Sequence, residues 1–379
     1  MRRGMYLYAW DLQDEGVSAV ASRLRDAGLD AISLATAYHA GKFLRPHAPR
    51  RKVYFPEDGT VYFKPDFALY GRLQPQPAAM LAEFDPLTEL ARHVPDFHLT
   101  GWTVGLHNSR LGALHPDRCA QSPFADPLCN SLCPSQPDVR AYLIALCTDL
   151  ARQPGIKEIS IEAPGFQAFR HGHHHEFELI ELTPAVETLL GICFCPACTD
   201  LAQRAGIDAT GLGRQARHDL EAFFADSTAP ATDPEAHPDW VALHRLRAST
   251  VTSLMAEVRS ALDAGVSLAI IPSVQTPNDL CWREGSDLAA LAHTADRLEV
   301  PAYQSGPDAI ARDIAQVRAA AGPSARIGYI LRPTWPHVTG ADDLALAVQA
   351  ATAAGAESIS FYNYGHMRLQ SLDWISACR

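Results

Sequence analysis

The sequence predicts a single (β/α)8 barrel, an α/β fold in which eight parallel strands alternate with helices. Short runs rich in β-branched and aromatic residues alternate with longer Ala- and Leu-rich runs of helical periodicity along the whole chain. Repeated strand–helix units form a parallel sheet, and eight of them close into a barrel. The first strand is not followed by the GxGxxG sequence of an open dinucleotide-binding sheet, and no phosphate-binding loop sequence is present. These observations favour the barrel over an open sheet.

The predicted strands are short apolar runs, and most of them end in polar or aromatic residues. The first is MYLYAWD, the fourth is IKEISIE and the eighth is ESISFYNY. In chain order the strands are predicted over residues 5–11, 30–38, 98–106, 156–162, 266–274, 297–303, 325–331 and 357–364.

Helices are predicted between these strands. An amphipathic run over 15–27 ends at Gly28, a residue typical of helix C-termini. Further helices are predicted over 86–94 and 137–152, and several more within 186–263. The last three are predicted over DLAALAHTA, PDAIARDIAQVRAAA and ADDLALAVQAATAAG.

Three long segments interrupt this alternation, and each follows a strand. Residues 40–84 contain VYFPEDGTVYF, in which Asp-Gly predicts the turn of a β-hairpin. Residues 107–136 and 163–240 follow the third and fourth strands. Because βα loops lie at the C-terminal face of such a barrel, we expect these insertions to wall a pocket there. No low-complexity linker separates them from the rest, so residues 1–379 are predicted to form one domain.

The composition argues against several classes of protein. Acidic residues outnumber Lys and Arg by 43 to 32, which disfavours nucleic acid as a partner because binding to phosphates needs a basic surface. No run of 18 apolar residues is present, so we expect no membrane span. The first residues lack a signal-like apolar region and the nine cysteines suit a reducing compartment, so we expect a cytoplasmic protein. The sequence leaves open whether the protein forms a homo-oligomer.

The strand ends and the loops that follow them carry many polar and aromatic side chains. Sugar rings present apolar C–H faces that aromatic rings can cover, while amides and imidazoles bond the hydroxyl groups. A small carbohydrate or glycoside is therefore the expected partner, although most aromatic residues in any barrel belong to the core. The predicted substrate-binding residues are Trp10, Tyr38, His39, Trp102, His107, Asn108, His173, His175, Gln275, Tyr303, Arg332, Tyr362 and Tyr364.

Glu162 is the main catalytic candidate. In EISIEAPGF, Ile159 and Ile161 alternate with Ser160 and Glu162, so the isoleucines are predicted to face the helices and Glu162 to point into the barrel. A partly desolvated carboxyl has a raised pKa, which suits general acid/base catalysis. The alternative is a structural salt bridge to an arginine.

Asp11 is the predicted second carboxylate, because glycoside hydrolysis usually needs two. The two carboxyl groups should lie about 6.5–9.5 Å apart for inversion and about 5–5.5 Å apart for retention. The alternative for Asp11 is a cap on the helix that follows.

Two motifs raise the question of a metal. The loop after the fourth strand contains HGHHHE over 171–176, which could bind a divalent ion. The sequence CFCPAC places Cys193, Cys195 and Cys198 together, and a closed zinc site would need a fourth ligand such as Cys129 or Cys133. The pattern favours solvated histidines and packed thiols, so we expect no metal and no cofactor.

The segment from Cys133 to Cys198 contains PDVRAYLIALCTDL, ISIEAPGF and LLGICFCPACTDLAQRAGID. It resembles a stretch of uncharacterised glycoside-hydrolase-like (β/α)8 barrel proteins, in which a strand ending in Glu is followed, after an insertion, by a CFCxxC helix start. The runs YHAGKFLRPH and VYFPEDGTVYF also look like parts of such proteins, and the matching runs cover roughly a third of the chain. The resemblance implies a carbohydrate-active barrel with Glu162 as its catalytic candidate. The seventh strand, GYILRPTW, lacks the carboxylate of well-studied retaining families.

We therefore expect a glycoside hydrolase that uses Glu162 as general acid/base. Two alternatives stay open at this point. One is a metal-dependent sugar isomerase, epimerase or lyase on the same barrel, and the other is a non-catalytic carbohydrate-binding barrel.

Overall fold

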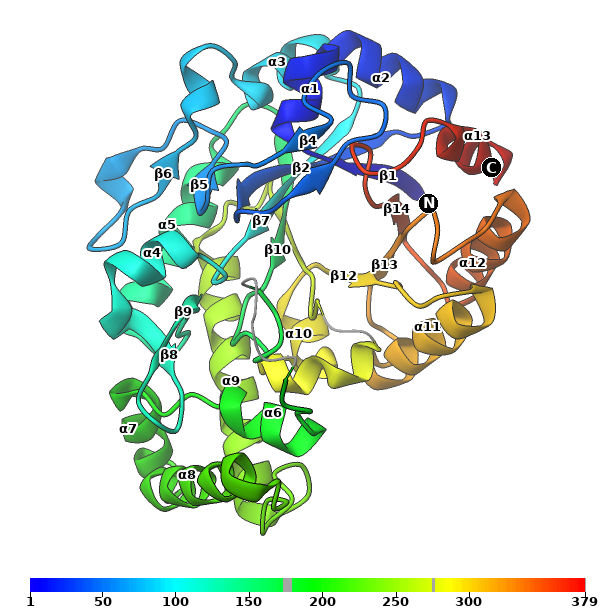
Figure 1. Cartoon of the computed structure of the whole chain (residues 1–379). Coiled ribbons are helices and arrows are strands. Elements are labelled where there is room, and N and C mark those ends of the chain that lie inside the picture. Colours follow the sequence, from blue (N-terminus) through cyan, green and yellow to red (C-terminus); the bar gives the residue numbers. More distant parts are fainter. Residues whose placement is uncertain (173–178, 275–276, 379) are drawn as a thin grey trace.

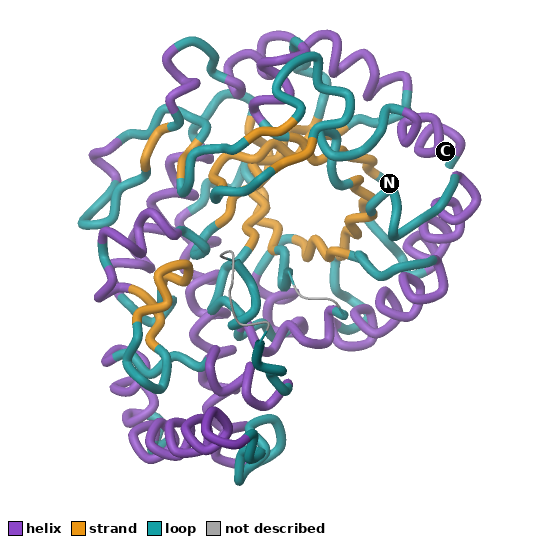
Figure 2. The backbone as a smooth tube through the Cα atoms, viewed as in Figure 1, coloured by secondary structure: helices purple, strands orange, loops and turns teal. Residues whose placement is uncertain are grey.

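The computed structural model describes residues 1–172, 179–274 and 277–378, and it shows a closed parallel barrel. Each of the eight barrel strands pairs in parallel with two neighbours, and the first strand joins both the second and the last to close the ring (Figure 2). The predicted (β/α)8 fold is confirmed. The barrel strands are β1 (Arg2–Leu7), β2 (Ala31–Tyr38), β7 (His98–Val104), β10 (Ile156–Glu162), β11 (Ser267–Ile270), β12 (Arg297–Pro301), β13 (Ile327–Leu331) and β14 (Ser358–Phe361).

Helices surround this ring on its outer side (Figure 1). Several begin with a proline in the first turn, where the missing backbone N–H leaves no donor unpaired. The barrel helices are α1 (Ala9–Glu15), α2 (Val17–Asp26), α3 (Pro86–His93), α5 (Pro137–Ala151), α9 (Pro238–Ala261), α10 (Leu288–Thr294), α11 (Pro307–Ala321), α12 (Ala341–Ala353) and α13 (Gln370–Ala377).

The alternation predicted for the fourth strand is present in β10. Ile159 and Ile161 are fully buried in the apolar layer between the strands and the helices. Ser160 points the other way, into the barrel, where its hydroxyl donates to Glu299 at 3.0 Å. Arg297 pairs with Glu299 and with Glu158 in the same interior, so the buried charges there are compensated. The inner face of β10 thus leads from a closed polar network upward to Glu162.

The first strand is shorter than predicted. β1 ends at Leu7, and α1 begins at Ala9, so Trp10 and Asp11 lie in a helix and not at a strand end. The carboxylate of Asp11 accepts a hydrogen bond from the backbone N–H of Tyr8 at 3.1 Å. This contact satisfies a donor that the start of the helix would otherwise leave free, and it accounts for the early turn.

The prediction of a hairpin within 53–63 is wrong, because its two arms pair with different partners. β4 (Val53–Tyr54) pairs with β3 (Phe43–Leu44), and β5 (Thr60–Val61) pairs antiparallel with the end of β2. β6 (Gln76–Pro77) pairs in parallel with the other side of β5. Tyr62 and Phe63, which follow β5, are buried, and this burial holds the second arm against the barrel.

The insertions after β7 and β10 lie together on one side of the barrel (Figure 1). The first forms α4 (Ser109–Leu114) and a hairpin of β8 (Cys119–Gln121) and β9 (Pro127–Leu132). The second forms α6 (Pro184–Gly191), α7 (Pro196–Arg204) and α8 (Ala209–Asp226), which we call the insertion lobe.

The insertion lobe has a small core of its own. Leu189, Leu220 and Phe223 pack there against Trp240 and Leu243 of α9. None of the described helices is by itself long and apolar enough to cross a membrane, although α6 and α7, bent by 96°, reach the length and apolar composition jointly.

Candidate active site

A cavity of about 190 Å³ opens where the barrel strands end. It is lined by residues from β1, β2, β7, β10, β12 and β13 and by residues that follow β2 and β10 to β14. The structure thus brings together residues that lie far apart in sequence. The predicted site residues that line it are Tyr38, His39, Trp102, Glu162, Tyr303, Arg332 and Tyr362.

Glu162 is the last residue of β10, and its side chain lines the cavity. The indole N–H of Trp102, on the neighbouring strand β7, donates to Oε2 of Glu162 at 2.6 Å. Burial raises the pKa of Glu162 to about 7, although the Trp102 hydrogen bond and the positive charge of Arg332 both lower it. Near neutral pH the carboxyl group therefore exists in both forms, and it can give up or take a proton.

Arg332 supplies the positive charge of the cavity. Its guanidinium carbon lies 3.9 Å from the ring centre of Tyr303 and 5.2 Å from that of Tyr362. Nη1 of Arg332 lies 3.2 Å from Nε2 of His337, which holds the guanidinium from the other side. An arginine packed against two aromatic rings is a rigid donor for ligand oxygens.

Three tyrosines form a hydrogen-bonded group at one wall. The hydroxyl of Tyr8 donates to that of Tyr38 at 3.1 Å and lies 3.0 Å from that of Tyr362. Burial raises the pKa of all three tyrosines, so they stay neutral donors. The predicted binding residues included neither Tyr8 nor Tyr6. Of these two, Tyr6 lines the cavity. The alternation in MYLY, with Met5 and Leu7 in the outer core, is the signal that identifies both.

Stacked imidazoles continue this wall beyond Tyr38. The ring of His39 stacks on those of Tyr38 and His107, with centroid distances of 4.3 and 4.5 Å. His171 meets His107 edge-on at 5.3 Å and lines the cavity. Burial lowers the pKa of His39 and lowers that of His171 to about 4, so both rings are neutral at pH 7. His107 does not line the cavity itself, and its ring packs against those of His39 and His171.

Asp11 and Trp10 do not line the cavity, and this corrects the sequence-based interpretation. Asp11 is fully buried, and its Oδ1 lies 3.0 Å from Nη2 of the equally buried Arg45. Trp10 stacks on Tyr8 at 4.4 Å within an aromatic cluster behind the cavity wall. The helix start at Ala9 turns both side chains away from Glu162. Asp11 therefore has a structural role, but not the predicted cap on the following helix: it lies inside α1 and pairs with Arg45, while Gly16 occupies the N-cap of α2.

Asn108 and Tyr364 also have structural roles, because their polar groups are already engaged. Asn108 caps α4 by accepting the backbone N–H of Leu111 at 2.9 Å. β14 ends at Phe361 and not at the predicted residue 364, so strand alternation does not decide where the side chains of Tyr362 and Tyr364 point. The hydroxyl of Tyr364 instead donates to Glu15 at 2.8 Å, beside the helices. His173, His175 and Gln275 lie outside the described residues.

A separate group of metal-ligand type involves cysteines only. Within the described ranges, the only cluster of three or more His, Cys, Asp or Glu side chains spaced for a metal ion is Cys133, Cys193, Cys195 and Cys198. Glu162 is not part of such a cluster there. Residues 173–176 of the HGHHHE run lie outside the described residues.

Comparison of the sequence with protein-family models and with curated proteins finds no match. Solved structures do match. The glycoside hydrolase domain of PgaB (BpsB) from Bordetella bronchiseptica is similar over 96% of this chain and 94% of that chain, with a TM-score of 0.59 and 14% identity. A β-galactosidase from Marinomonas ef1 matches 99% of this chain and 58% of that chain, with a TM-score of 0.58 and 12% identity.

A class V chitinase from Pseudomonas fluorescens Pf-5 matches 100% of this chain and 99% of that chain, with a TM-score of 0.52 and 11% identity. At these identities the likeness extends to the fold, and function has to be argued from the site itself. The chain thus has the (β/α)8 barrel of these three structures.

Proposed function

We propose that this protein is a glycoside hydrolase in which Glu162 is the general acid/base. The observation that carries the proposal is a carboxyl group whose pKa is raised to about 7 by burial, at the end of a barrel strand and inside a cavity. Such a pKa suits both halves of the reaction, because the group first protonates the leaving oxygen and then deprotonates a water molecule. Two of the similar structures are a glycoside hydrolase domain and a chitinase, which agrees with this chemistry at the level of the fold.

The cavity suits a single sugar unit. Its volume of about 190 Å³ is below the ~300–1,000 Å³ of pockets for drug-sized ligands. Trp102 and Tyr362 offer apolar ring surface to the C–H faces of a sugar, and Arg332 offers a charged donor to its oxygens. We infer that the enzyme binds one terminal sugar in the cavity and cleaves the bond that links it to the rest of the substrate.

The nucleophile is inferred to come from the substrate. Glu162 is the only carboxylate among the described residues that line the cavity, whereas most glycosidases use two. Substrate-assisted glycosidases use a 2-acetamido group of the sugar as the nucleophile instead. The acetamido oxygen then bonds to the anomeric carbon as the bond to the leaving oxygen breaks and Glu162 protonates that oxygen. Water, deprotonated by Glu162, opens the resulting ring and restores both groups.

A panel of aryl glycosides tests both parts of the proposal. We expect 2-acetamido glycosides to be hydrolysed at least about 100-fold faster than the matching 2-hydroxy glycosides, because an intramolecular nucleophile has a high effective concentration. Initial rates of aryl alcohol release measure the difference. Faster hydrolysis of the 2-hydroxy series would refute the substrate nucleophile and leave a hydrolase. Tight sugar binding without release from either series would instead identify a non-catalytic carbohydrate-binding barrel.

A further inference from the structure

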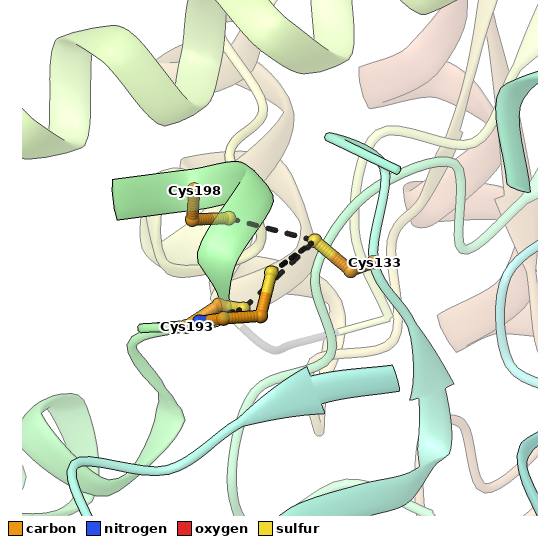
Figure 3. A group of neighbouring side chains, drawn as sticks. Cys133, Cys193 and Cys198 are labelled. Carbon is orange, nitrogen blue, oxygen red and sulfur yellow. Dashed lines mark hydrogen bonds between the residues drawn. The ribbon is translucent and has the colours of Figure 1, made fainter. Parts of the chain in front are cut away.

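Four cysteines from two distant parts of the chain meet beside the barrel (Figure 3). Cys133 directly follows β9, while Cys193, Cys195 and Cys198 surround the start of α7. All four are buried, and their sulfur atoms lie within 4.8 Å of one another. The CFCPAC sequence supplies three of them, and the fold adds the fourth.

The sulfur–sulfur distances distinguish between a disulfide and a metal site. Sγ of Cys133 lies 3.5 Å from that of Cys198, 3.6 Å from that of Cys195 and 3.8 Å from that of Cys193. A disulfide would bring two sulfurs to about 2.05 Å. Four thiolates bound tetrahedrally at about 2.3 Å from a zinc ion are about 3.8 Å apart. The distances fit the metal site and exclude a bond between Cys133 and any of the other three.

Two of the four sulfurs accept hydrogen bonds of the kind that stabilise thiolates. The backbone N–H of Gln121 donates to Sγ of Cys193 at 3.3 Å, and that of Cys195 points to the same sulfur at 3.5 Å. The amide of Gln136 donates to Sγ of Cys195 at 3.8 Å. Such outer hydrogen bonds orient metal ligands and offset their negative charge.

A buried positive charge lies near the cluster. Arg247 is buried, and its guanidinium carbon lies 4.5 Å from the ring centre of Phe166, which packs in the same cluster as the four cysteines. A zinc ion with four thiolates carries a net charge of −2, which is costly to bury without a counter-charge. The guanidinium of Arg247 would provide part of that compensation.

We propose that Cys133, Cys193, Cys195 and Cys198 bind one Zn²⁺ as a closed structural site. On binding, the four thiols release four protons to solvent and become thiolates, with no change of oxidation state. The four protein ligands fill the tetrahedral shell, so no position is left for water or substrate. The zinc ion would therefore stabilise the folded protein and would take no part in the reaction at Glu162.

The proposed ion would join two insertions. Cys133 ends the β8–β9 hairpin, and the other three ligands open the second helix of the insertion lobe, some 60 residues further along the chain. A cross-link over a long loop reduces the freedom of the unfolded chain and so stabilises the folded one. The ion would hold the insertion lobe against the β8–β9 hairpin.

Metal content and cobalt substitution test the proposal on the full chain. We expect the protein, purified without added chelator, to contain one zinc per chain by elemental analysis. After replacement of zinc by Co²⁺, we expect the intense visible bands of tetrahedral cobalt together with sulfur-to-cobalt charge-transfer bands. The variants C133S and C198S should lose most of the bound metal, and the melting temperature of the wild type should fall when a strong chelator removes it.

C129S is the matched control, because Cys129 lies in β9, shortly before Cys133, and is not part of the cluster. We expect this variant to keep one zinc per chain. Wild-type protein that neither contains zinc nor gives the cobalt–sulfur bands on titration would overturn the proposal, even if the cysteine variants fail to fold. Full zinc content in both C133S and C198S would overturn it as well.

Discussion

Replacement of Glu162 by Gln is expected to lower kcat/KM for glycoside hydrolysis by about 10²–10⁴-fold, the contribution typical of a general acid/base. Gln keeps the size of the side chain, and its amide oxygen can still accept the indole N–H of Trp102. The variant loses only the proton that the reaction requires. Initial rates on the best aryl glycoside measure the effect, and calorimetric titration with the product sugar shows whether the cavity still binds.

Glu89→Gln is the control for this prediction. Glu89 lies on α3, partly exposed and paired with Arg92 and His93, so its loss should leave the rate unchanged. A rate for Glu162→Gln within about threefold of the wild type would mean that the carboxyl group takes no part in proton transfer.

Replacement of Arg45 by Met is expected to destabilise the fold by about 3–5 kcal/mol, because it leaves the buried carboxylate of Asp11 without its charged partner. Nη2 of Arg45 lies 3.0 Å from Oδ1 of Asp11, and Nη1 lies 2.7 Å from Oδ2 of Asp14. Burial already raises the pKa of Asp11 to about 6 in spite of Arg45. Denaturant unfolding at pH 8, where Asp11 is ionised, measures the loss of stability.

Arg50→Met is the matched control, since Arg50 pairs with the same Asp14 from an exposed position, with Nε 2.8 Å from Oδ1. An exposed ion pair contributes about 0–1 kcal/mol, so this variant should unfold almost as the wild type does. Equal losses of stability in the two variants would show that burial of the ion pair between Arg45 and Asp11 does not cause the expected destabilisation. We also expect the folded fraction of Arg45→Met to keep its activity, because Asp11 lies outside the cavity.

The fold was predictable because the alternation of strands and helices is a local signal repeated along the chain. The position of Glu162 was predictable for the same reason, since the two-residue period of IKEISIE fixes which side chains point inward. The period is reliable only while the strand lasts. It failed for Asp11 and Tyr364, which lie beyond the ends of β1 and β14.

Other parts of the site depend on contacts between distant segments. The sequence does not show that Arg45 reaches Asp11 across 34 residues, or that Cys133 is the fourth cysteine of the CFCPAC cluster and Cys129 is not. The arms of VYFPEDGTVYF have strand character, yet their partners are chosen by the barrel. His171 lines the cavity because the loop after β10 folds back over it, which no local pattern indicates.

The most direct test of the account is a titration of the Glu162 carboxyl group by carbon-13 NMR or by infrared difference spectroscopy, with Glu162→Gln to identify its signal. Because burial raises the pKa of the folded protein's Glu162 above its ordinary value of 4.5, the group should be protonated below about pH 7 and ionised above it. A carboxyl signal that titrates near pH 7 and is missing from the Gln variant is the predicted result. A pKa of Glu162 at or below its ordinary value would contradict the account, because the group would then be ionised at neutral pH and unable to act as the acid.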